Sequence, residues 1–127
     1  MTAYSIPRSV LWNESMILEE MIEGTPAYKK LITLGWTFYV VNQSRGRCYY
    51  SNKWITIPLH AWQRQSDGYL AYYIAHEAAH AYAGRKANHG PKFMQWLKKL
   101  CPANYLHYEL GYRPRNATSA GIMPKDF

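Results

Sequence analysis

Residues 76–80 read His76-Glu77-Ala78-Ala79-His80, and this stretch decides both the fold and the chemistry that the rest of the chain must fit. In a helix, positions i and i+4 lie one turn apart on the same face, so His76 and His80 can bind one metal ion. Glu77 projects roughly 100° around the helix from His76, where it can take a proton from a water molecule at the metal. The pattern therefore predicts a zinc-binding helix with a general base beside its ligands.

The surrounding residues predict that this helix runs from about residue 68 to residue 83, capped by Ser66 and Asp67. A buried histidine or glutamate carries a desolvation cost unless it is paired or bound to a metal. Hydrogen-bonded core histidines would explain one such residue easily, but they explain three within five positions badly. We therefore favour metal binding. The helix is apolar on nearly every face, through Leu70, Tyr72, Tyr73, Ile74, Ala75, Ala78, Ala79, Ala81 and Tyr82.

A third ligand is expected because a catalytic zinc takes three protein ligands and keeps one position open. Residues 84–88 break the helix, and Pro91 suits the first turn of a following one. His89 stands just before that turn, where its side chain could complete the metal site. By residue type alone, His89 is as readily a polar loop residue or a helix cap.

The run His76-Glu77-x-x-His80, followed by His89-Gly90-Pro91-x-Phe93, resembles the SprT-like, or Spartan-like, zinc metallopeptidases. The resemblance covers residues 36–101 in outline and residues 76–93 specifically. It implies peptide hydrolysis with one Zn²⁺ ion. The implied zinc ligands are His76, His80 and His89, and the implied general base is Glu77.

The cysteine content limits the resemblance, because members of that family often carry a C-terminal zinc ribbon with paired Cys-x-x-Cys motifs. Cys48 and Cys101 are the only cysteines, so no ribbon is expected, and both residues are predicted to be free thiols. At 127 residues and 48% hydrophobic content, the sequence predicts one folded domain. We place that domain at residues 1–111 and a loosely ordered tail at 112–127. The sequence has no apolar run of membrane-spanning length and no signal segment, so a cytoplasmic protein is expected, from a bacterium or a phage.

The net charge of +7 is concentrated in the C-terminal half of the chain. Such a field raises the local concentration of polyanions and suits nucleic acid, an acidic protein or an anionic surface, although charge alone slightly favours an ordinary solvated basic surface. The family resemblance favours DNA, because eukaryotic relatives act on proteins bound to DNA. The candidate nucleic-acid-binding residues are Arg85, Lys86, Lys92, Lys98, Lys99, Arg113 and Arg115.

Before Gly35 the apolar spacing predicts two helices or one broken helix, with Asn13 or Ser15 as a cap. After it, β-branched and aromatic residues predict strands over 36–41, 47–50 and 53–57. The expected fold is α+β: a small zincin-like single domain with a three-stranded antiparallel sheet packed beside a central zinc-binding helix, with flanking helices. The candidate edge strand, which would bind the substrate backbone by β-augmentation, is Trp54, Ile55, Thr56 and Ile57. The same residues are as readily a plain sheet strand that contributes to the core.

The predicted function is a zinc-dependent endopeptidase that hydrolyses peptide bonds, in DNA-associated proteins by resemblance. The alternative is a basic nucleic-acid-binding protein, or an inhibitor of a host enzyme, with a structural zinc site. The protein substrate, its cleavage preference and the oligomeric state are left open by the sequence. So is the oxyanion-stabilising residue, for which the candidates are Arg85, His107, Tyr82, Tyr105, Tyr108 and Tyr112.

Overall fold

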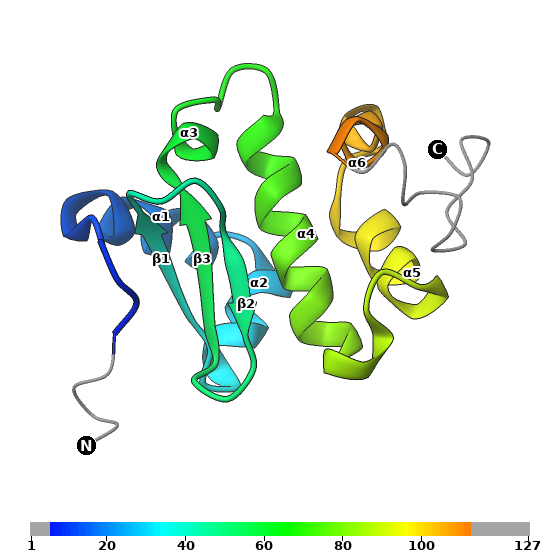
Figure 1. Ribbon diagram of the computed structural model, residues 1–127, viewed down its shortest axis with the longest axis horizontal. Helices are drawn as coiled ribbons and strands as arrows, with labels where there is room; N and C mark the ends of the chain where they lie inside the picture. The colour runs from blue at the N-terminus through cyan, green and yellow to red at the C-terminus, as the bar shows by residue number, and fades with distance from the viewer. Residues whose placement is uncertain (1–5, 113–127) are drawn as a thin grey trace. The chain divides into compact units, whose positions relative to one another are not determined.

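A computed structural model describes residues 6–112, which form an α+β fold of six α-helices and one three-stranded mixed sheet (Figure 1). The α+β class and the three strands are thus confirmed. The chain divides into two compact units. Met1–Gln63 contains the sheet, and Arg64–Phe127 contains the helix with the motif His76-Glu77-x-x-His80, called the HExxH helix below. The packing of the sheet beside that helix stays a prediction, and residues 113–127 of the predicted tail lie outside the described part.

The N-terminal unit begins with the two predicted helices, α1 (Trp12–Glu23) and α2 (Pro26–Thr33). Pro26 occupies the first turn of α2, as the sequence indicates, because the missing N–H of proline costs nothing there. A third helix, the single turn α3 (Leu59–Trp62), follows the sheet and was not expected from the sequence.

Neither Asn13 nor Ser15 caps α1, contrary to the expectation, because both lie inside the helix and the N-cap residue is Leu11. Ser15 has another role. It is buried inside the helix, where its hydroxyl donates a hydrogen bond to the Leu11 carbonyl at 2.7 Å. The same oxygen accepts the Val40 backbone N–H at 2.8 Å. This contact fastens α1 to the first strand, beside the fully buried Leu18 and Val40. Ser15 therefore links helix α1 to the first strand of the sheet.

The sheet comprises β1 (Thr37–Val41), β2 (Arg47–Tyr49) and β3 (Trp54–Pro58), in the order β1-β3-β2. β2 and β3 form an antiparallel hairpin, whereas β1 and β3 run parallel. The prediction of an all-antiparallel sheet is therefore wrong for the β1–β3 pair. Burial explains the order: β3 is almost wholly apolar and buried, so it takes the centre, and the short, half-exposed β2 takes the edge.

The prediction that Trp54, Ile55, Thr56 and Ile57 form the edge of the sheet is also wrong. They lie in the central strand β3, whose backbone pairs with β1 on one side and β2 on the other. A substrate strand cannot add to a strand already paired on both sides. Ile55, Thr56 and Ile57 are at most 2% exposed, so their side chains belong to the core.

The C-terminal unit contains α4 (Tyr69–Ala83), α5 (Pro91–Leu100) and α6 (His107–Tyr112), with 3₁₀ turns at Arg85–Ala87 and Ala103–Tyr105. The predicted long helix is α4, and ten of its fifteen residues are buried. None of the helices within residues 6–112 combines the length and apolar character needed to cross a bilayer.

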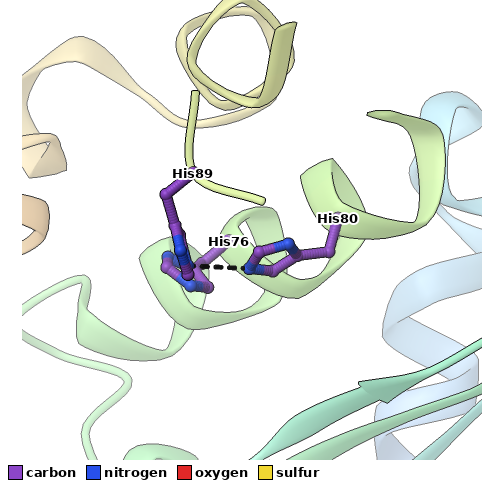
Figure 2. A group of neighbouring side chains, drawn as sticks. All are labelled: His76, His80 and His89. Carbon is purple, nitrogen blue, oxygen red and sulfur yellow. Dashed lines mark hydrogen bonds between the residues drawn. The ribbon is translucent and has the colours of Figure 1, made fainter. Parts of the chain in front are cut away.

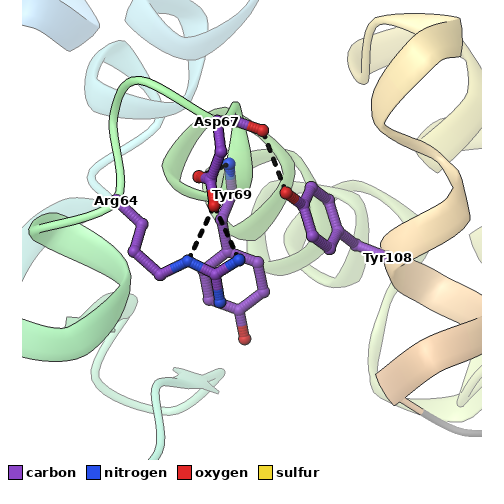
Figure 3. A network of polar contacts seen from close by, with 4 residues as sticks. All are labelled: Arg64, Asp67, Tyr69 and Tyr108. Atoms are coloured by element: carbon purple, nitrogen blue, oxygen red, sulfur yellow. Dashed lines mark hydrogen bonds and ion pairs between the residues drawn. The ribbon is translucent and has the colours of Figure 1, made fainter.

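The start of α4 is held by a polar network around Asp67 (Figure 3). Its carboxylate accepts the Tyr69 backbone N–H at 3.1 Å and binds Arg64 through two N–H groups at 2.7 and 2.9 Å. The N-cap residue itself is Gly68, so the predicted cap at Ser66 and Asp67 is wrong in position, and Asp67 bonds the first turn from the residue before the cap. The hydrogen bond from Arg64 lowers the pKa of Asp67. Tyr108, on α6, donates its hydroxyl proton to the Asp67 carbonyl at 2.9 Å. The network therefore joins α6 to the first turn of α4.

Gly68, between this network and α4, has a φ of +79°, and a Cβ atom there would overlap the ring of Tyr105. We expect Gly68→Ala to lower the free energy of unfolding by about 1–3 kcal/mol, because alanine is strained at this φ and the ring must move. Urea denaturation measures the change.

The matched control is Gly24→Ala, where φ is −78° and the added Cβ would have only an ordinary contact, 3.4 Å from the Met21 carbonyl oxygen. We expect this control to change the unfolding free energy by less than about 0.5 kcal/mol. Equal effects of the two substitutions would contradict the steric argument.

Candidate metal centre

Three histidines meet in the C-terminal unit (Figure 2). His76 and His80 come from one face of α4, and His89 comes from the loop that precedes α5. One ring nitrogen from each lies within 4.8 Å of the others, and this is the only such group of potential ligands within residues 6–112. The structure thus places His89 beside the two helix histidines, as the third-ligand hypothesis requires.

The donor set fits a transition-metal ion. Nε2 of His80 and Nε2 of His89 are 3.0 Å apart. With metal–nitrogen bonds of about 2.0–2.1 Å, tetrahedral ligands lie about 3.3 Å from one another, so small side-chain rotations would suffice. Imidazole nitrogens suit zinc, copper, iron and nickel. The cluster could therefore bind a metal ion without rearrangement of the backbone.

Glu109, on α6, contacts Nδ1 of the His76 ring. Its Oε1 accepts the hydroxyl proton of Tyr72 at 2.7 Å and lies 2.8 Å from Nδ1 of His76. A carboxylate at this position favours the tautomer that carries its proton on Nδ1, which leaves Nε2 as the acceptor. His76 is therefore oriented with Nε2 available to a metal ion.

The Glu109 carboxylate is ionised at neutral pH although the residue is only 1% exposed. Burial raises the pKa, and it is the largest single influence. The hydrogen bonds from His76 and Tyr72, together with the nearby charges of His76 and His89, outweigh it and lower the pKa of Glu109 to about 2. The lowered pKa favours a negative charge on Glu109, behind His76, where it would balance a bound cation.

Phe93 fills the space beside the three imidazoles. Its ring centroid lies 5.0 Å from that of His76, 4.5 Å from His80 and 4.9 Å from His89, and the residue is fully buried. One turn further along α5, Trp96 stacks on Tyr82 of α4 at 4.2 Å. Through these contacts the two aromatic residues hold α5 and the preceding loop, which carries His89, against α4.

Glu77 follows His76 on α4 and is 6% exposed. It is not one of the three residues that could share a metal ion. Glu77 is nevertheless adjacent to the predicted ligand His76 on the same helix, which is the position that the sequence predicts for a residue acting beside the ion. Its role as the general base stays a prediction.

None of the other candidate residues within the described part of the chain belongs to the three-histidine group. His60 and His107 are exposed and contact the backbone carbonyls of Ser44 and Asn104. Arg113 and Arg115 lie outside the described residues. The remaining candidate nucleic-acid-binding residues, all exposed, are Arg85, Lys86, Lys92, Lys98 and Lys99.

Sequence reasoning missed Glu109 and Tyr72 as partners of His76. A signal was present for both. Tyr72 lies four residues before His76, on the same helical face. Glu109 is the only acidic residue between Glu77 and Asp126, and an isolated acid in a basic, aromatic segment suggests a specific partner.

We expect Glu109→Gln to weaken metal binding by about 10-fold to 100-fold, as removal of a hydrogen-bonded carboxylate behind a histidine ligand typically does. Glutamine keeps an acceptor atom but loses the charge that favours the required tautomer of His76. Competition with a fluorescent zinc chelator measures the affinity.

Tyr72→Phe is the matched control, since it removes the buried hydroxyl that donates to Glu109 at 2.7 Å and lies 3.2 Å from Nδ1 of His76, but leaves the charge of Glu109 in place. Its effect should be several-fold smaller. Unchanged affinity in a folded Glu109→Gln protein would show that the carboxylate does not support the site.

Comparison with known proteins gives one match. Residues 18–112 match the sequence model of the SprT-like family. The matched range includes the histidine cluster and extends over both units of the described chain. No curated protein and no solved structure matches the chain.

Proposed function

Because the chain belongs to the SprT-like family, we propose that it is a zinc-dependent endopeptidase that cleaves proteins associated with DNA. The histidine cluster is the observation that carries this proposal. Three imidazoles, one of them backed by a buried carboxylate, would supply the three protein ligands of a catalytic zinc ion, which keeps its fourth position for water or substrate. A purely structural zinc site has no need of a glutamate next to its ligands, and Glu77 is therefore the residue that favours catalysis.

The proposed roles follow from the positions of the side chains. His76, His80 and His89 would hold the zinc ion, which when bound supplies a Lewis acid that polarises the scissile carbonyl. Glu77 would accept a proton from the attacking water and return it to the amine that leaves. Glu109 and Tyr72 would keep His76 in place while this happens.

Three of the oxyanion candidates named above contact other groups in the structure, and one of these is His107, at the Asn104 carbonyl. The Tyr108 hydroxyl donates to the Asp67 carbonyl, and Tyr82 stacks on Trp96, where burial raises the pKa of its hydroxyl. Arg85, in the 3₁₀ turn after α4, is exposed and follows the HExxH helix directly. We propose Arg85 as the first residue to test for this role.

DNA-associated proteins are proposed as substrates on the basis of charge and family. The exposed cations Arg85, Lys86, Lys92, Lys98 and Lys99 belong to the unit that holds the histidine cluster. A bound DNA strand would bring its attached proteins near the site and raise their local concentration.

The test is metal-dependent cleavage of an unfolded protein and of a DNA-binding protein, with and without DNA. Protein treated with a chelator should be inactive, and added zinc should restore cleavage. Zinc retention without cleavage of any substrate would favour the alternative, a binding protein in which the zinc is structural.

A further inference from the structure

The N-terminal unit contains a pocket with a volume of about 600 Å³, formed by residues 6–9, the turn after β1, and the neighbouring ends of β2 and β3. This volume lies in the range of pockets that hold small organic ligands, about 300–1,000 Å³. Every lining residue belongs to the N-terminal unit, so the pocket is complete without the histidine cluster.

Three arginines line the pocket: Arg8, Arg45 and Arg47. All three are exposed, and no acidic residue lines the pocket. Among the described residues, no carboxylate forms an ion pair with any of the three. The guanidinium group is a planar fork of donors that fits phosphate oxygens, and three such groups around one pocket favour a phosphate ligand.

Two aromatic side chains form part of the same wall. Tyr49 of β2 and Trp54 of β3 are paired across the hairpin, with ring centroids 5.4 Å apart, and both are partly exposed. The Arg47 guanidinium lies 6.0 Å from the centre of the Tyr49 ring. Partly exposed aromatic rings beside cations provide a surface on which a nucleobase can stack.

Backbone contacts hold these walls in place. The Gln43 side chain donates to the Arg8 carbonyl at 2.6 Å, and the Asn42 N–H donates to the Ser9 carbonyl at 2.9 Å. On the other wall, the Arg47 N–H donates to the Thr56 hydroxyl at 2.9 Å. A pocket held in this way loses little conformational entropy when it binds a ligand.

We propose that this pocket binds a nucleotide, with the phosphate held by Arg8, Arg45 and Arg47 and the base packed against Tyr49 and Trp54. In a duplex the base faces are stacked inside, so the ligand is a free nucleotide or one nucleotide of a single strand. No residue of the C-terminal unit lines the pocket, and the proposal does not depend on peptidase activity.

The test is binding of a fluorescein-labelled oligothymidylate to the full chain, followed by fluorescence anisotropy. The double substitution Arg45→Gln/Arg47→Gln should weaken binding by at least about tenfold and reduce the slope of log K against log salt by up to about 0.7, the value for one phosphate on a single strand. Tyr49→Leu should weaken binding by about tenfold through the loss of base stacking.

The matched control is Lys29→Gln/Lys30→Gln, which removes the same charge from exposed positions on α2 of the same unit, outside the pocket. It should change the affinity less than about twofold. An equal loss in both double variants would overturn the proposal in favour of unspecific charge attraction, as would the absence of binding. Unchanged binding by a folded Tyr49→Leu protein would overturn the base contact.

Competition separates the two sources of the ligand. Displacement of the labelled strand by thymidine monophosphate would support a free nucleotide as the ligand, and displacement by unlabelled single strand alone would support a nucleotide within a strand. Duplex that competes as well as single strand would overturn the proposal. Because no arm measures peptide cleavage, failure here is distinct from failure of the endopeptidase function.

Discussion

Replacing Glu77 with glutamine is expected to lower the rate of peptide hydrolysis by about 10²–10⁴-fold, the usual contribution of a general base. The amide has nearly the shape of the carboxylate but cannot accept a proton from water. The three histidines are untouched by the change, so zinc content should stay at the wild-type value. A steady-state cleavage assay, with zinc measured on the same preparation, gives both quantities.

The matched control for this substitution is Glu20→Gln, which neutralises an exposed glutamate on α1 and should leave the rate unchanged. If Glu77→Gln keeps full activity, the general base is another residue. If the wild-type protein cleaves nothing and Glu77→Gln retains every binding property of the wild type, the chain acts as a binding protein.

The second large effect is expected from His89→Ala. Loss of one of three ligands should weaken zinc binding by more than about 100-fold, the upper limit for loss of a residue that only supports a ligand. After dialysis, elemental analysis should find about one zinc ion per wild-type chain and almost none in the variant. Peptide cleavage should be lost in parallel.

His60→Ala is the matched control, because it removes an exposed histidine that lies in the other unit and has no part in the cluster. It should keep its zinc. Full zinc retention by His89→Ala would mean that His76 and His80 bind the ion with a different third ligand, and the ligand set proposed here would be wrong.

The sequence predicted the three-histidine cluster because its signal is local. Helical spacing alone brings His76 and His80 together, and a short loop followed by Pro91 limits where His89 can lie. Glu109 could not be placed in the same way, since its contact with His76 spans 33 residues of chain. Periodicity carries no information about which distant side chain approaches the back of an imidazole ring.

The strands were also predicted from local patterns, but their order was not. Residue types indicate that β1, β2 and β3 are extended, and the turn between β2 and β3 favours a hairpin. Whether β1 pairs with β2 or β3 depends on which strand is buried on both sides. The run Ile55-Thr56-Ile57 indicates that β3 is the central strand, because an uninterrupted buried run is typical of a strand buried on both sides.

The mixed pairing of the sheet also has a consequence for the order in which the N-terminal unit assembles. Tyr49 and Trp54 pair across a short turn, so the hairpin closes a small loop at low entropic cost. Pairing of Thr37 with Trp54 closes a longer loop than the hairpin does, and pairing of Val10 with Val41 closes a still longer loop. Contacts distant in sequence form late, so the segment that carries Arg8 is expected to dock last. A ligand that binds Arg8 together with Arg47 would then favour the fully assembled unit over its partly folded precursors.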